Sequence, residues 1–177
     1  MKIKNSGGLL PNLVLLILLM FCCGKPTFGQ ETINLSIGFS MPDGINAGIH
    51  FQPKQSQIRF GFGMMPLKEE SFISLSSDFY YHFAGSSELS VRRPWYGRIG
   101  LIYLRDETKY VIDKSLYLNP RIGRDFNISE KVGIDLDVGM IFRLFHEEID
   151  KEPSSASFIN LDFPILPGFG ISLFYRI

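Results

Sequence analysis

The side chains best suited to hydrolytic chemistry are one histidine and three serines near it. His82 could act as a general base, and Ser76, Ser77 or Ser86 could act as a nucleophile. A catalytic triad also needs an orienting acid within hydrogen-bond reach, and no motif spacing around these residues supplies one. The sequence therefore favours no catalytic role for them, and ester hydrolysis stays an alternative.

Metal and cofactor sites have no recognisable motif. His50 and His146 stand alone, without the spacing of metal ligands. The acidic stretches Glu69–Glu70 and Glu147–Glu152 could hold divalent cations that bridge to phosphate groups, but such clusters are usually solvated loops. No phosphate-binding, dinucleotide-binding, zinc-protease or calcium-loop motif occurs. We predict no cofactor, no resident metal and no catalytic residue.

A second set of charges alternates with apolar residues along the chain. Its members are Arg59, Asp78, Arg98, Arg121, Asp135, Asp137, Arg143 and Arg176. If these side chains share the inside of a barrel they must pair, because an unpaired buried charge costs several kcal/mol. We expect Asp135 and Asp137 to meet arginines from neighbouring strands. The network could line a selective pore, but in a barrel of about eight strands, which has room only for side chains, a plugged lumen is favoured.

The first thirty residues have the pattern of a secretory signal peptide. Lys2 and Lys4 precede an uncharged apolar run over Leu9–Phe21, and small residues at Thr27 and Gly29 fit a cleavage site. The run is shorter than the ~20 residues that a membrane-spanning helix needs. We therefore expect a signal peptide over residues 1–29, cleaved after Gly29, and one mature domain over residues 30–177.

Loss of the signal peptide changes both the charge and the cysteine content. It removes three lysines and no acid, which leaves 15 basic and 18 acidic residues, a net charge of −3. That balance gives no support for nucleic-acid binding, which needs a clustered basic surface. Cys22 and Cys23 are the only cysteines, so the mature chain has no disulfide. Lipidation of Cys22 is the alternative, but Phe21 stands where a lipidation site has a small residue.

Apolar residues recur at every second position in eight separate runs. In the clearest run, Val132, Ile134 and Leu136 alternate with Gly133 and Asp135. Such alternation puts the two sets on opposite faces of a β-strand. The runs cover residues 33–41, 45–52, 57–64, 73–83, 95–104, 116–123, 132–144 and 169–177. Because no run has helical periodicity, the sequence predicts an all-β, eight-stranded antiparallel up-and-down barrel.

Alternation alone leaves open whether the apolar face points inward or outward. A soluble lipocalin-like carrier would bury that face, whereas an outer-membrane barrel would expose it to lipid. Several runs approach the nine to eleven residues that a tilted membrane strand needs. Aromatic residues such as Tyr81, Trp95 and Tyr103 stand near run ends, as in membrane-interface girdles. These features favour a transmembrane barrel.

With these features the chain resembles the small outer-membrane β-barrel proteins of Gram-negative bacteria, a class that includes the OmpX and OmpA barrels. The resemblance covers residues 31–177, including the last run Gly168–Ile177, which ends on Ile where such barrels often end on Phe. It implies a place in the cell outer membrane, contact with lipopolysaccharide and insertion by the barrel-assembly machinery. It also implies a structural or surface-interaction role, in which outward loops bind an extracellular partner. An enzyme that modifies outer-membrane lipid is the alternative.

An even number of strands puts both ends of the barrel on one side, which we expect to be the periplasm. The periplasmic turns are then predicted at residues 53–57, 84–94 and 127–131. The outward loops are predicted at residues 42–44, 66–71, 106–114 and 147–167.

Overall fold

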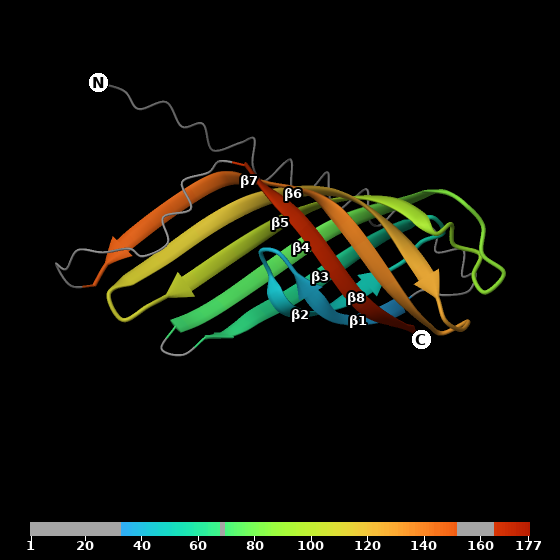
Figure 1. The fold of residues 1–177 in the computed structure, drawn as a ribbon, viewed down its shortest axis with the longest axis horizontal. Helices are drawn as coiled ribbons and strands as arrows, with labels where there is room; N and C mark the ends of the chain where they lie inside the picture. Colours follow the sequence, from blue (N-terminus) through green and yellow to red (C-terminus); the bar gives the residue numbers. More distant parts are fainter. Residues whose placement is uncertain (1–32, 68–69, 152–164) are drawn as a thin grey trace, which may run out of the picture.

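Eight antiparallel strands close into a barrel in chain order, as Figure 1 shows. The structure is a computed structural model that describes residues 33–67, 70–151 and 165–177. The strands are β1 (Ile33–Ser40), β2 (Gly44–Phe51), β3 (Ser56–Leu67), β4 (Glu70–Ala84), β5 (Trp95–Glu107), β6 (Val111–Asn127), β7 (Val132–Asp150) and β8 (Ile165–Arg176). The predicted signal peptide lies outside the described residues.

The barrel is closed by the pairing of its first and last strands. Leu35 of β1 lies opposite Tyr175 of β8 in an antiparallel register. Each of the other strands pairs with its neighbours in the chain, so the predicted up-and-down topology is confirmed. Among the described residues, no helix is long and apolar enough to cross a membrane.

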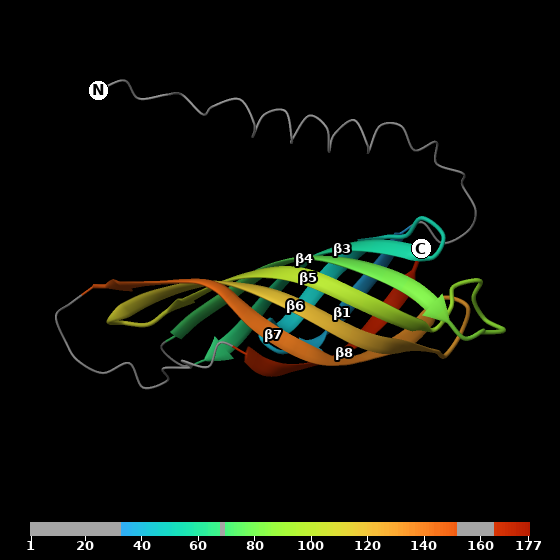
Figure 2. The same cartoon turned by 90° about the horizontal axis from the view of Figure 1, so that it is seen from above.

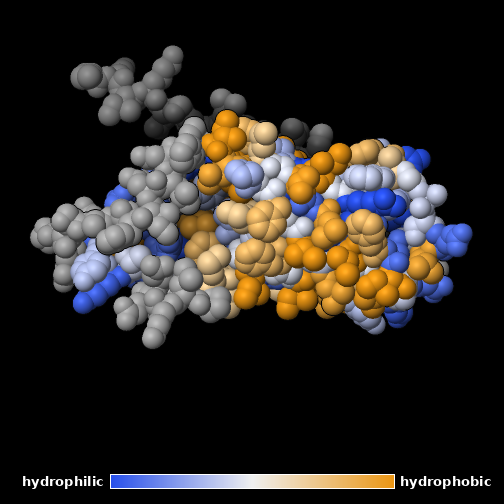
Figure 3. Space-filling model, in the orientation of Figure 1, coloured by the Kyte–Doolittle hydropathy of each residue, from blue (hydrophilic) through white to orange (hydrophobic). Residues whose placement is uncertain are grey.

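The apolar face of the strands points outward. Leu136 is 43% exposed on the barrel wall, whereas its neighbour Asp137 is 4% exposed in the lumen. Figure 3 shows apolar side chains spread over the barrel wall on one face of the molecule. Exposed aromatic residues gather at the end that carries both termini of the barrel: Phe51, Tyr81, Trp95, Phe126 and Tyr175. This surface suits lipid and rules out the lipocalin-like alternative, which would bury the apolar face.

Strands β5, β6 and β7 are longer than the alternation predicted. The predicted loop at residues 106–114 is a tight hairpin in which the Thr108 amide donates to the Val111 carbonyl at 2.9 Å. The acidic stretch from Glu147 to Asp150 also belongs to a strand, although a loop was predicted there. In Figures 1 and 2 the ends of these strands project past the barrel body. We call residues 105–114 and 143–151 the projecting ladder.

Cross-strand ion pairs stabilise the projecting ladder where apolar alternation stops. Lys114 Nζ lies 3.5 Å from Glu147 Oε2, and Lys151 Nζ lies 2.7 Å from Glu107 Oε1. The hydrogen bond from the Lys151 ammonium holds the pKa of the Glu107 carboxyl below its ordinary value. Polar pairs of this kind carry no period-two hydrophobic signal, which is why the sequence predicted loops here.

Candidate functional site in the barrel lumen

Two aspartates and three arginines form one connected network in the middle of the lumen. Asp78 lies 3.0 Å from Arg59 and 2.9 Å from Arg98. Asp137 lies 3.0 Å from Arg98 and 2.6 Å from Arg121. Arg98 contacts both carboxylates and so links them. All five side chains are buried, and they come from the five consecutive strands β3 to β7. The predicted pairing of Asp137 with arginines is therefore confirmed.

Glycines on neighbouring strands make room for these large side chains. A Cβ atom at Gly48 would lie 2.5 Å from Arg59 Nε. A Cβ atom at Gly100 would overlap the carboxylate of Asp78. The inward-facing glycines thus leave the space that the large charged side chains of the lumen occupy.

The β1–β2 turn closes the lumen on the side of the projecting ladder. Asp43 is 1% exposed, and its carboxylate accepts a hydrogen bond from Ser40 at 3.1 Å. Ser74 donates to the Asp43 carbonyl at 3.3 Å, and Arg121 donates to the Met41 carbonyl. The turn therefore folds over the central network and is bound to it.

At the opposite mouth, the β4–β5 connection at residues 85–94 sends Arg92 into the lumen. Arg92 Nη2 lies 2.7 Å from Asp125 Oδ2, and Nη1 donates to Gln52 Oε1 at 2.6 Å. The guanidinium also lies over the ring of Phe174, 5.0 Å from its centre. Sequence reasoning missed Arg92 because a predicted turn has no periodicity that shows which side chain points inward.

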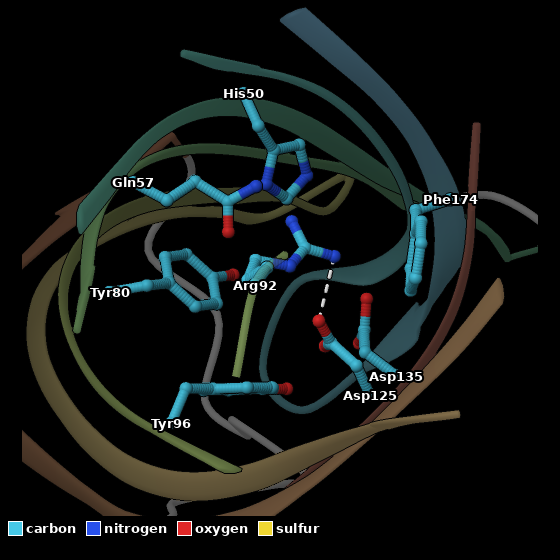
Figure 4. A pocket seen from close by; sticks show the side chains of 8 residues that line it. All are labelled: His50, Gln57, Tyr80, Arg92, Tyr96, Asp125, Asp135 and Phe174. Atoms are coloured by element: carbon cyan, nitrogen blue, oxygen red, sulfur yellow. Dashed lines mark ion pairs between the residues drawn. The ribbon is translucent and has the colours of Figure 1, made fainter. Parts of the chain in front are cut away.

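A small cavity with a volume of about 10 Å³, enough for roughly one water molecule, lies beside Arg92. Figure 4 shows its lining of His50, Gln57, Tyr80, Arg92, Tyr96, Asp125, Asp135 and Phe174. Its lining is mainly polar and aromatic, and it lies at the level where Arg92 enters the lumen.

The structure corrects the prediction for Asp135. No described residue donates a hydrogen bond to this carboxylate or forms an ion pair with it within 4.0 Å. Asp135 lies opposite Asp125 in the β6–β7 register, and Arg92 pairs with Asp125. The strand register therefore places Asp125 and Asp135 side by side, and Arg92 from the β4–β5 connection pairs with Asp125 alone of the two.

The predicted catalytic candidates are not brought together. His82 Nδ1 lies 2.8 Å from the Arg93 carbonyl, and Ser76 Oγ accepts a hydrogen bond from Arg59 at 3.0 Å. Ser77 is exposed on the outward face of β4, and Ser86 is exposed in the connection that follows β4. Ser76 and His82 are six residues apart on β4, roughly 20 Å along an extended strand. These residues form no triad.

A different serine and histidine meet in the lumen, which sequence reasoning missed. His50 Nε2 lies 2.8 Å from Ser36 Oγ, across the β1–β2 pair. No described residue makes a hydrogen bond with His50 Nδ1. Because a triad needs an acid at that nitrogen, the pair lacks the orienting member. The register of the first two alternating runs was the signal that could have predicted this contact.

The other metal-ligand candidates lie in the projecting ladder. His146 Nδ1 is 3.0 Å from Asp113 Oδ1, and Glu147 pairs with Lys114. Within residues 33–67, 70–151 and 165–177, no group of three or more His, Cys, Asp or Glu side chains could hold a metal ion. Glu69 and Glu152 lie outside the described residues.

Comparison with known proteins supports the fold. No family model and no curated protein sequence matches the chain. The crystal structure of Acinetobacter baumannii CarO is similar, with a TM-score of 0.51 at 8% identity over 87% of this chain and 100% of that one. The fold is that of an outer-membrane β-barrel. A. baumannii CarO2 has a TM-score of 0.48 at 9% identity, covering 85% of this chain and 100% of its own.

The outward apolar wall agrees with that fold. Leu35, Ile99 and Ile171 are each between 43% and 50% exposed on different strands. A surface of this kind is stable against lipid hydrocarbon and unfavourable in water. The fold and the outward apolar wall together confirm the predicted outer-membrane barrel.

Proposed function

We propose that the protein is a closed outer-membrane barrel with a structural and surface-interaction role and no catalytic activity. The observation that carries this proposal is the bridge from Arg98 to both Asp78 and Asp137, at 2.9 and 3.0 Å, in the middle of the lumen. An eight-stranded barrel has room only for side chains, and here ion pairs occupy that room. Outer-membrane lipid, lipopolysaccharide and the barrel-assembly machinery are the partners that such a barrel requires.

We expect no sustained single-channel conductance from the purified protein in planar lipid bilayers. The physical reason is that ions would have to cross the central network and the Arg92 level, where polar side chains already bind one another. A large porin inserted under the same conditions is the positive control. A stable, ion-selective current from this protein would contradict the closed barrel.

The projecting ladder supports the surface-interaction part of the proposal. The β7–β8 pairing ends at Phe142 and Ile165, so residues 143–150 pair with β6 alone among the described strands. Leu144, Phe145 and Ile149 are exposed along this edge. An unpaired strand edge with apolar side chains can accept an extended segment of another protein. The proposed partner contact is therefore strand addition at β7.

A photo-cross-linking amino acid at Phe145 tests this contact in intact cells. We expect protein adducts from position 145, because the side chain is 54% exposed on the projecting ladder. The matched control is Ile122, which is 49% exposed on the lipid-facing wall of β6 and should label lipid. If position 145 yields no more protein adducts than position 122, the ladder is not an interaction surface.

A further inference from the structure

We propose that the cavity of Figure 4 belongs to a guanidinium-binding site in the barrel lumen, which Arg92 fills from its own chain. The Arg92 side chain is 3% exposed, although it comes from a surface connection. Two of its nitrogens contact Asp125 and Gln52, and its plane lies over Phe174. An anionic acceptor, a neutral acceptor and a ring face together match a planar guanidinium.

The site and its occupant come from separate parts of the fold. Asp125 lies on β6, Phe174 on β8, and Gln52 directly follows β2. Arg92 comes from residues 85–94, where Val91 is 73% exposed and Leu89 is 38% exposed. The pocket residues therefore belong to barrel strands or their ends, whereas the side chain that enters the pocket comes from a connection.

The pocket offers more polar partners than Arg92 uses. Asp135 lines the same cavity without an ion pair, and Tyr96 Oη has no hydrogen-bond partner among the described residues. Arg92 Nε likewise makes no hydrogen bond with the described residues. A free guanidinium, unrestrained by the loop, can turn to use these groups. The ligand class is thus a guanidinium group: in the parent protein it is the Arg92 side chain, and a free guanidinium can enter only when that side chain is removed.

Chemical rescue of an Arg92→Ala variant tests the site. We expect the apparent midpoint of thermal unfolding in detergent to fall by about 10 °C, because Asp125 loses a buried partner. Millimolar methylguanidinium should restore much of this loss by binding the folded state, and methylammonium or sodium chloride at equal ionic strength should not. The same salts should leave the parent protein unchanged, because Arg92 already fills the site.

Two further variants keep the test decisive. Arg93→Ala removes the adjacent exposed guanidinium, which among the described residues donates only to the Phe83 carbonyl at the surface, and should show a much smaller loss and no rescue. Arg92→Lys keeps the charge but not the planar fork, so it should stay less stable than the parent and should be measured if Arg92→Ala fails to fold. Parent-like stability of Arg92→Lys, or equal effects of methylguanidinium and sodium chloride on Arg92→Ala, would overturn the proposal. Conductance of the parent protein is measured separately, so the proposal of a closed barrel and the proposal of a guanidinium site can be contradicted independently of each other.

Discussion

Replacement of Asp137 by alanine should lower the free energy of unfolding by about 3–5 kcal/mol. The Asp137 side chain is 2% exposed and binds both Arg98 and Arg121. Its loss leaves Arg121 without a carboxylate partner in the described lumen and leaves Arg98 with Asp78 alone. Urea titration of the barrel in detergent or lipid, followed by its heat-modifiable shift on a gel, measures the loss.

Asp135→Ala is the matched control for this experiment. Asp135 lies two residues away on the same inward face of β7, but no described residue forms an ion pair with it. We therefore expect Asp135→Ala to change stability by much less than Asp137→Ala. Equal losses at both positions would show that the ion pairs do not determine the stability of the lumen.

Replacement of Leu136 by arginine should cost about 2–4 kcal/mol in a bilayer, because it puts a charge on the lipid-facing wall near mid-strand. Leu136 is 43% exposed and lies between Asp135 and Asp137, which face the lumen. Unfolding of the variant in lipid vesicles measures this loss. A fluorophore at position 136 should also be quenched by lipid-borne quenchers, whereas one at the exposed position 149 of the projecting ladder should not.

Ile149→Arg separates lipid contact from simple loss of an apolar side chain. Ile149 is also on β7 and is 38% exposed, but it lies on the projecting ladder beyond the last β7–β8 pair. We expect its replacement to have little effect on stability in lipid. A loss as large as that at Leu136 would mean that the barrel wall and the ladder share one environment.

The strands of the barrel body could be predicted because lipid imposes a simple pattern. Each outward position between the two interfaces must be apolar, so Leu136 and Val138 show the strand directly in the sequence. Beyond the bilayer that requirement ends, and Lys114 and Glu147 pair across strands with no apolar signal. The ends of β5, β6 and β7 were therefore predicted as loops.

The sequence predicted which residues share the lumen, but not all of their partners. Alternation showed that Asp135 and Asp137 share the lumen face, but strand register decides which arginine each one meets. Asp137 lies level with Arg98 and Arg121, while Asp135 lies opposite Asp125. Arg92 comes from a connection without regular structure, so no periodic pattern in the sequence indicates its position.

The β1–β8 closure has a consequence for how the barrel is made. Asn34 pairs with Arg176, so the last seam joins positions at opposite ends of the described chain. Contacts so distant in sequence form slowly, because a long loop must close before they are gained. Until then the sheet has two free edges, β1 and β8, both able to pair with a neighbouring chain. Assembly therefore requires that the edges of β1 and β8 stay protected from other chains until they pair with each other.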